Sequence, residues 1–413
     1  MKKYAKKIGR ILGFSFLFLL ISGNLFIVLS GRYYLYSAIA KTYLRGESGP
    51  GIYDLDLFSK TTIHTKNTPF IWKNHSKINS YKSNNEELVY HEKWGTTAFL
   101  VIHKDSILYE KYWGEHNKAT VSNSFSAAKT IIALLIGIAL DEGHIKSLDE
   151  PVGNYIPQFN KLGRQKVTIR HLLQMSSGLD WEESGSNPIS EAAEGYFTSD
   201  LYPLVTRQLV VEEPGKRFNY QSGNSQLLGI ILANATKMNL SKYMETRLWK
   251  PIGASSLAYW STDQENGVEK SFCCFYATAR DYALLGRLLL NKGNWQGKQL
   301  ISAKYMDELI SLPNLKMKEG IPNFRYGLHT WVYQNNNNPV YYFRGFHGQY
   351  IMTVPKDDLI IVRLGMKRED DYKINEIQTN RKELPKQIQE KIGHSPDVFT
   401  YINHAYSIIN SIK

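Results

Sequence analysis

An uncharged run of twenty residues, Ile11–Ser30, limits what this chain can fold into more than any other feature. As a helix it would span about 30 Å, the thickness of a bilayer core. Five Lys or Arg residues precede the run and are expected to stay in the cytoplasm, which would place residues 32–413 outside. A cleaved signal peptide is the alternative, because its basic and apolar regions look alike. Since no A-x-A-like cleavage site follows, we favour an uncleaved, single-pass anchor with the rest of the chain on the extracytoplasmic side.

The net charge of +12 belongs mainly to the N-terminal end of the chain. Eight of the 50 Lys and Arg residues lie within residues 1–45, which hold no Asp or Glu. The rest of the chain holds the other 42 basic residues and all 38 acidic ones, so its net positive charge is small. Because the basic charge is explained by the N-terminus, we predict no nucleic-acid partner.

The only two cysteines, Cys273 and Cys274, are adjacent and cannot join distant parts of the fold. An exported protein of this size without a long-range disulfide must rely on its hydrophobic core. We interpret both residues as buried small apolar side chains.

Runs rich in β-forming residues lie near both ends of the chain, and helical patterns occupy the middle. Thr96–Trp113 predicts two strands that form a hairpin, and Tyr350–Leu364 predicts further strands. Between them, residues 150–270 have helical patterns and few β-rich runs. This order predicts an α/β (α+β) fold in which an antiparallel sheet flanked by helices is interrupted by a helical domain.

We divide the chain into three parts on this basis. Residues 1–31 are expected to be a cytoplasmic basic flank and a transmembrane signal anchor, and residues 32–90 a stalk and lead-in. Residues 91–413 are expected to form the folded domain, with the helical insertion at about 150–270 and a charged insertion at 366–390.

Ser126 and Lys129 stand at the start of an apolar helical segment, "SAAKTIIALLIGIAL". Residues three apart on a helix share one face, so the two side chains are expected to lie one turn apart. Serine is a poor nucleophile until a neighbouring base takes its proton. Burial against the apolar run would lower the pKa of Lys129 from about 10.4 and let it act as that base. An exposed lysine on an amphipathic first turn is the alternative.

Two later stretches extend the pattern. "EPGKRFNYQSGN" holds Tyr220 and Ser222 as Tyr-x-Ser, and "YFRGFHGQYIMTVP" holds a glycine-containing third motif. They occur in order with "LDEPVGNYIP", "VTIRHLLQMSSGLDWEE" and "ATARDYALLGRLLLNKGNWQGKQLI". From Thr96 to Leu364 the chain resembles the serine β-lactamase and penicillin-binding-protein superfamily. The resemblance is to the class C-like branch, which includes esterases and 6-aminohexanoate-dimer hydrolases.

The resemblance implies a β-lactamase/transpeptidase-like fold and a role for each matching residue. Ser126 would be the acylated nucleophile, and its backbone N–H would form one half of an oxyanion hole. Lys129 would activate Ser126, and Tyr220 would carry protons between the nucleophile, the leaving group and water. Ser222 would hydrogen-bond the substrate or Lys129.

The third motif departs from the β-lactamase pattern. Aligning "FHG" on the usual Lys-Thr-Gly puts Phe346 where a cation helps to hold the substrate carboxylate. Together with Ser222 in place of Asn, this argues against efficient penicillin hydrolysis. The resemblance implies that Gln349, after Gly348, gives the second oxyanion-hole N–H. His347 either takes part in substrate binding or proton transfer, or is a structural residue at a strand edge.

The loop "SSGLDWEESGS" offers further contacts to a substrate. Asp180, Glu182 and Glu183 could each receive an ammonium or amide group, as an acidic residue in this region does in some amide-cleaving relatives, and we choose Asp180 as the candidate. Solvation of the loop by its acidic residues is the alternative.

The sequence therefore predicts a membrane-anchored serine hydrolase of esterase or amidase type, acting on a small ester, amide or peptide substrate. The resemblance implies that its membrane is a bacterial cell membrane, crossed once, with the catalytic domain on the extracytoplasmic (periplasmic) side. A membrane-tethered penicillin-binding or sensor protein, or a D-amino peptidase acting at the cell wall, is the alternative. The eleven histidines show no metal-ligand spacing, so we predict no metal and no cofactor. The oligomeric state is not predicted.

Overall fold

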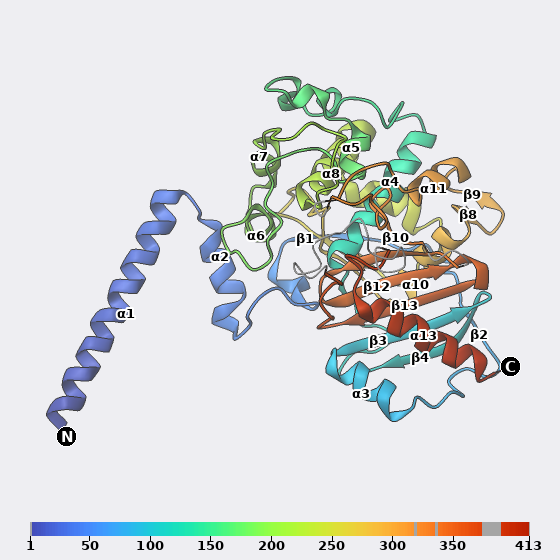
Figure 1. Ribbon diagram of the computed structural model, residues 1–413, viewed down its shortest axis with the longest axis horizontal. Coiled ribbons are helices and arrows are strands. Elements are labelled where there is room, and N and C mark those ends of the chain that lie inside the picture. Colours follow the sequence, from blue (N-terminus) through green and yellow to red (C-terminus); the bar gives the residue numbers. More distant parts are fainter. Residues whose placement is uncertain (1, 318–319, 335–337, 374–389, 413) are drawn as a thin grey trace.

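The computed structural model describes residues 2–317, 320–334, 338–373 and 390–412. Helix α1 (Lys2–Ser30) projects away from the body that the later residues form (Figure 1). Within its stretch Tyr4–Ser30, the most apolar window of 18 residues has a mean hydropathy of 2.3, and only 6% of that window is buried. By length and composition this helix can cross a membrane, and a secretory signal sequence has the same character.

Seven strands form the main sheet of the described chain, and neighbouring strands are antiparallel except β2 and β4. Their order is β10 (Trp331–Tyr333), β11 (Val340–Gly345), β12 (Gln349–Val354), β13 (Leu359–Gly365), β3 (Thr96–His103), β4 (Ser106–Tyr112) and β2 (Lys73–Asn74). The hairpin of β3 and β4 turns at Lys104 and Asp105, which both have the positive φ that a tight two-residue turn needs. The predicted α/β class with an antiparallel sheet is confirmed.

Alternate residues of β3 enter two different cores, because successive side chains of a strand point to opposite faces. Leu100 and Ile102 pack on the side of α10 (Ala279–Leu290), whereas Phe99 and Val101 pack on the side of α13 (Pro396–Asn410). Helix α3 (Asn85–Lys93) also contacts β3. Helices thus flank the main sheet, as the sequence predicts.

The helical region is built on α4 (Ala128–Asp141) and α8 (Ser222–Thr236), which pack against each other. Residues 128–139 of α4 are all buried, as expected for a helix that is apolar on every side. The shorter helices that contact this pair are α5 (Ile169–Leu173), α6 (Glu191–Phe197), α7 (Leu201–Thr206), α9 (Leu240–Met244) and α11 (Ala303–Leu309).

A second sheet joins the segment before residue 90 to the body. Its order is β1 (Lys60–Ile63), β6 (Ala258–Ser261), β7 (Phe275–Ala277) and β5 (Ser122–Asn123), and a separate hairpin is formed by β8 (Asn294–Trp295) and β9 (Lys298–Gln299). Ile52 and Ile63 are buried, so much of the expected stalk is built into the body. Of the charged insertion expected at 366–390, residues 374–389 lie outside the described chain. The domain boundaries stay a prediction.

Candidate active site

Ser126 lies in a short 3-10 turn, Phe125–Ala127, that leads directly into helix α4. Phe125 has a φ of 45°, so the chain bends sharply just before the serine. The Phe125 N–H donates to the Asn123 side chain at 2.8 Å, and the Ser124 N–H donates to the Phe275 carbonyl at 2.8 Å. These two bonds fix the turn and present a partly exposed Ser126 at the start of the helix.

Lys129 is buried one helical turn later, with 1% of its surface exposed. Its Nζ donates to Ser126 Oγ and Ser222 Oγ at 3.0 Å each, and to the Phe272 carbonyl oxygen at 2.8 Å. Loss of water around the ammonium lowers the pKa of Lys129 to about 8, and the nearby Glu183 carboxylate opposes part of that shift. The pairing and burial expected from the sequence are therefore present.

The Tyr220 phenol lies beside this pair. Lys129 Nζ is 5.2 Å from the centroid of the Tyr220 ring, and Tyr220 and Ser126 line the same cavity. Burial raises the pKa of Tyr220, and the charge of Glu183 raises it further. The phenol therefore keeps its proton at neutral pH and can donate it to a neighbouring oxygen or nitrogen.

Glu183 lines the cavity, whereas the sequence analysis chose Asp180 among the three acids of this loop. Its carboxylate accepts from Ser222 Oγ at 2.5 Å, from the Ser222 N–H at 2.6 Å and from Trp181 Nε1 at 2.8 Å. Ser222 is the first residue of α8, where the helix dipole favours a negative charge. Hydrogen bonds thus run from Glu183 through Ser222 to Lys129, and the charge of Glu183 stabilises the ammonium.

These side chains open into one cavity of about 650 Å³, a volume typical of small-molecule sites. Ser126, Glu183 and Ser222 line it. Most of the remaining wall is apolar, and its aromatic members are Phe125, Tyr196, Phe197, Phe218, Tyr220, Phe272, Trp331 and Phe346. The cavity is therefore suited to a largely apolar group next to the Ser126 hydroxyl.

Three arginines, Arg325, Arg344 and Arg368, line the same cavity. Arg344 and Arg368 share the Asp371 carboxylate, at 2.5 and 2.6 Å. Because two guanidinium groups face this one carboxylate, their side of the cavity has an excess of positive charge.

The third motif lies at the tight turn between β11 and β12, and the part that meets the nucleophile is Gly345 and Phe346. Both line the cavity with Ser126. A Cβ atom on Gly345 would come 2.0 Å from the Ser124 carbonyl oxygen, so only glycine allows the strand to approach this closely. The Phe346 ring packs edge-on against Phe125, with centroids 5.6 Å apart.

The other predicted site residues are not among those that line the cavity. Asp180 lies at the surface, where it accepts from the Leu209 N–H at 2.7 Å. His347 Nε2 is 3.1 Å from the Pro50 carbonyl oxygen. Gly348 packs against Arg363, and the buried Gln349 side chain donates to the Phe346 and Gly365 carbonyls. Within the described residues, no cluster of three or more His, Cys, Asp or Glu could hold a metal ion.

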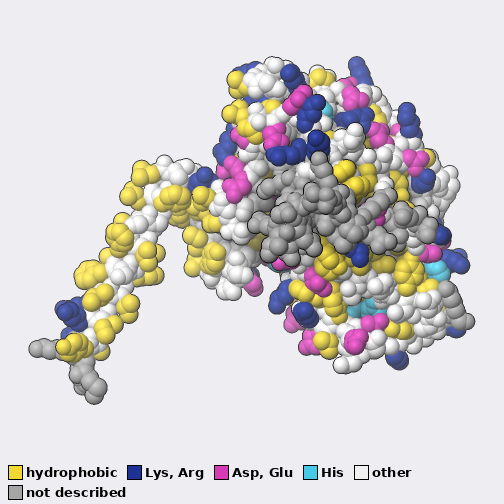
Figure 2. All heavy atoms as spheres, viewed as in Figure 1, with side chains coloured by type: hydrophobic (Ala, Val, Ile, Leu, Met, Phe, Trp, Pro, Cys, Tyr) yellow, Lys and Arg dark blue, Asp and Glu magenta, His cyan; other side chains and the backbone are white. Residues whose placement is uncertain are grey.

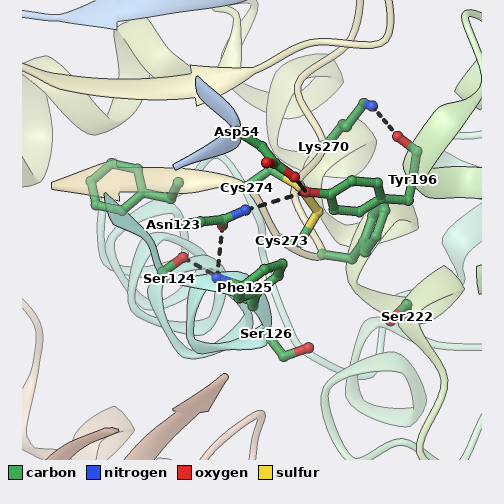
Figure 3. Close-up of a disulfide and its surroundings, with 12 residues drawn as sticks. Asp54, Asn123, Ser124, Phe125, Ser126, Tyr196, Ser222, Lys270, Cys273 and Cys274 are labelled. Atoms are coloured by element: carbon green, nitrogen blue, oxygen red, sulfur yellow. Dashed lines mark hydrogen bonds between the residues drawn. A yellow bond between two sulfur atoms is a disulfide. The ribbon is translucent and has the colours of Figure 1, made fainter. Parts of the chain in front are cut away.

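Cys273 and Cys274 are buried, as expected, but they are joined to each other by a disulfide, which corrects their interpretation as simple apolar side chains (Figure 3). Cys273 lines the cavity, and the residue before it, Phe272, gives the carbonyl that holds Lys129. The Cys273 carbonyl accepts from Trp260 Nε1 at 2.9 Å. The disulfide segment therefore forms the wall against which the Lys129 ammonium rests.

Comparisons with known proteins agree with this geometry. The sequence profile of the Beta-lactamase family matches residues 86–376, more than half of the chain. The 6-aminohexanoate-dimer hydrolase of Paenarthrobacter ureafaciens is 25% identical over 290 residues, which cover 66% of this chain and 73% of that protein.

Two solved structures share the fold. A Bacillus anthracis protein named after 6-aminohexanoate-dimer hydrolase gives a TM-score of 0.69 at 20% identity, covering 86% of this chain and 91% of its own. A family VIII carboxylesterase gives a TM-score of 0.57 at 17% identity, covering 78% and 96%. With the profile match, these likenesses establish that the chain belongs to the Beta-lactamase family and has the fold of serine β-lactamases and penicillin-binding proteins.

Proposed function

We propose that the protein is a serine hydrolase that cleaves ester or amide bonds through an acyl-enzyme on Ser126. The observation that carries this proposal is the buried Lys129 Nζ, 3.0 Å from Ser126 Oγ, with its pKa lowered to about 8. With that pKa, about a tenth of the molecules have a neutral amine at pH 7, which can take the hydroxyl proton. The relatives named as a dimer hydrolase and a carboxylesterase support the same chemistry.

Acylation begins when Ser126 Oγ attacks the substrate carbonyl carbon and its proton passes to the neutral Lys129 Nζ. The carbonyl oxygen becomes an oxyanion, which the backbone N–H groups of Ser126 and Phe346 would stabilise. The close approach of Gly345 to Ser124 supports Phe346 as the second donor, in place of the expected Gln349. The intermediate then collapses, and the bond from the acyl carbon to the leaving group breaks.

The protonated Tyr220 gives its proton to the departing oxygen or nitrogen and recovers one from Lys129. Deacylation repeats these transfers in reverse with water as the nucleophile. Water loses a proton to the Tyr220 and Lys129 pair, the acid product leaves, and Ser126 regains its hydroxyl proton. Glu183 and Ser222 hold Lys129 in position throughout.

An ester or linear amide is a better candidate substrate than a β-lactam. With Gly345 as the glycine of the third motif, Phe343 stands where β-lactamases have a cation, and Arg344, although it lines the cavity, is paired with Asp371. The apolar wall favours an acyl group without charge. We further propose that α1 anchors the protein in a bacterial cell membrane, with residues from Arg32 onward on the extracytoplasmic side.

The test uses the full-length protein in detergent, as wild type, Ser126→Ala and the control Ser186→Ala, which changes an exposed loop serine. Each is incubated with p-nitrophenyl acetate and butyrate while intact mass is recorded. We expect continuous turnover and a transient acyl adduct in wild type and control, and neither in Ser126→Ala. A stable adduct without turnover would identify a penicillin-binding or sensor protein instead. Equal rates in all three proteins would remove Ser126 as the nucleophile.

A further inference from the structure

The residues after α1 form a surface with large exposed side chains. We call them the juxtamembrane patch, which consists of Tyr33, Tyr36, Ile39, Tyr43 and Leu44, with exposed fractions between 40% and 78%. Lys41 lies among them in the sequence, and Arg32 and Arg45 flank them. Figure 2 shows hydrophobic side chains continuing from α1 onto the adjoining side of the body, where α2 (Tyr34–Lys41) lies in Figure 1.

This combination fits the surface of a lipid bilayer. Tyrosines collect at membrane interfaces, where their rings lie at headgroup depth, and Lys and Arg are attracted to anionic lipids. Tyr33 follows Ser30 by three residues, so the chain can carry it at most about 10 Å from the end of α1. The Tyr36 hydroxyl also donates to Asn24 Oδ1 of α1 at 2.9 Å. The patch therefore lies beside the C-terminal end of α1. If α1 crosses a membrane, the patch lies close to the membrane surface at that end.

The same segment is fastened to the wall of the cavity. Tyr34 is buried, and its hydroxyl donates to the Pro188 carbonyl at 3.0 Å. Arg32 Nη1 donates to the Ile189 carbonyl at 2.8 Å. Helix α6 begins just after these carbonyls, and the residues of this helix that line the cavity are Ala192, Ala193, Tyr196 and Phe197.

A second set of contacts joins the patch to the cavity through Phe58. Lys41 Nζ lies 4.1 Å from the centroid of the Phe58 ring. That ring packs against Tyr196 and Phe197, with centroids 5.3 and 6.3 Å apart. Pro50, farther along the same segment, lines the cavity itself. The cavity wall and the patch are thus parts of one packed unit.

We propose that the juxtamembrane patch rests in the headgroup region of the bilayer, and that the substrate is an amphiphilic ester that reaches the cavity from the membrane. The acyl chain would lie along the aromatic wall, next to Ser126. This inference rests on the proposed function, because it names the substrate class of the same serine. It adds no new chemical step: the alcohol leaves when Ser126 is acylated, and water then releases the fatty acid.

The first experiment uses the full-length protein in nanodiscs of phosphatidylcholine and phosphatidylglycerol. The double variant Tyr43→Ser/Leu44→Ser is compared with wild type and with Val89→Ser, which changes a 52% exposed residue on α3. The probes are p-nitrophenyl palmitate in the bilayer and p-nitrophenyl butyrate in water. We expect the double variant to lose about fivefold or more of its palmitate turnover and to keep its butyrate turnover, while Val89→Ser keeps both.

Unchanged palmitate turnover in the double variant would overturn the inference. So would a wild type that hydrolyses butyrate but not the bilayer-held palmitate. A wild type that hydrolyses neither ester would instead overturn the proposed function, so the two failures are distinguishable.

The second experiment places a spin label on Leu44→Cys, with Val89→Cys as the control. Labelling is specific because Cys273 and Cys274 are joined to each other. We expect the Leu44 label to be accessible to oxygen dissolved in lipid and shielded from a water-soluble nickel chelate, and the Val89 label to show the reverse. Equal nickel accessibility, or a spin–spin interaction showing that a second copy covers the patch, would overturn the inference.

Discussion

Lys129 Nζ donates three hydrogen bonds, which is all that an ammonium group offers. In that state it has no lone pair to take a proton, so acylation must begin from the neutral amine. Because the pKa of Lys129 is lowered to about 8, kcat/KM for p-nitrophenyl butyrate should rise about tenfold per pH unit below 8 and level off above it. Tyr220, with its pKa raised, stays protonated over this range. A rate that is flat or falling between about pH 6 and pH 8 would contradict this role of Lys129.

The carboxylate of Glu183 stabilises the Lys129 ammonium, so removing its charge should lower the pKa of Lys129 further. We expect Glu183→Gln to move the midpoint of the pH–rate profile to lower pH. The control is Glu182→Gln, since the neighbouring Glu182 binds the Asn187 side chain instead. Full profiles of both variants are the measurement, and an unmoved midpoint in Glu183→Gln would show that its charge does not act on Lys129.

At the level of single residues, the spacing of Ser126 and Lys129 on one helix face predicted their pairing, and the family resemblance added Tyr220 and Ser222. All four lie together in the structure. The sequence analysis did not select Glu183. The acids of an irregular loop have no period that tells which one faces the cavity, and Glu183 lines it whereas Asp180 does not.

Among the structural elements, the segment of the disulfide holds Lys129 most directly, through the Phe272 carbonyl that precedes Cys273. Reduction would let this backbone relax and loosen that acceptor. We expect kcat/KM to fall several-fold in phosphine reductant, in step with a mass gain of two hydrogen atoms, without loss of the folded state by circular dichroism. Cys273 reaches the cavity, which gives the reductant access. The double variant Cys273→Ala/Cys274→Ala should not respond to reductant, and full activity of reduced wild type would refute the expectation.

The β11–β12 hairpin shows why the sequence could locate the third motif but not the glycine of it that lies at the active site. Two glycines lie three residues apart across its turn, and the sequence reasoning placed Gly348 at the active site where the structure places Gly345. The chain reverses direction within those three residues. Gly345 therefore packs beside the nucleophile turn at Ser124, whereas Gly348 packs against Arg363, and choosing the wrong glycine selects the wrong side of the hairpin.

For the whole molecule, the class of the main sheet could be predicted because each of its long strands has a recognisable local pattern. The packing of residues 32–90 against the body could not be predicted. Strand β1 pairs with β6 across about two hundred residues, and neither strand is longer than four residues. Such a short non-local pairing leaves no periodic signal, and the segment therefore resembles a polar stalk.

Shortening the chain tests how the whole molecule depends on this segment. A form that begins at Arg32 loses only α1, whose apolar window is almost unburied, and should keep the melting temperature and butyrate turnover of the full chain. A form that begins at Lys66 also loses β1 and the buried Ile52 and Ile63. Burial of these two side chains contributes about 3–6 kcal/mol, which is comparable to the stability of a whole domain. We therefore expect the shorter form to be insoluble or to melt far below the first in thermal circular dichroism. Equal melting temperatures would mean that residues 32–65 are a stalk after all.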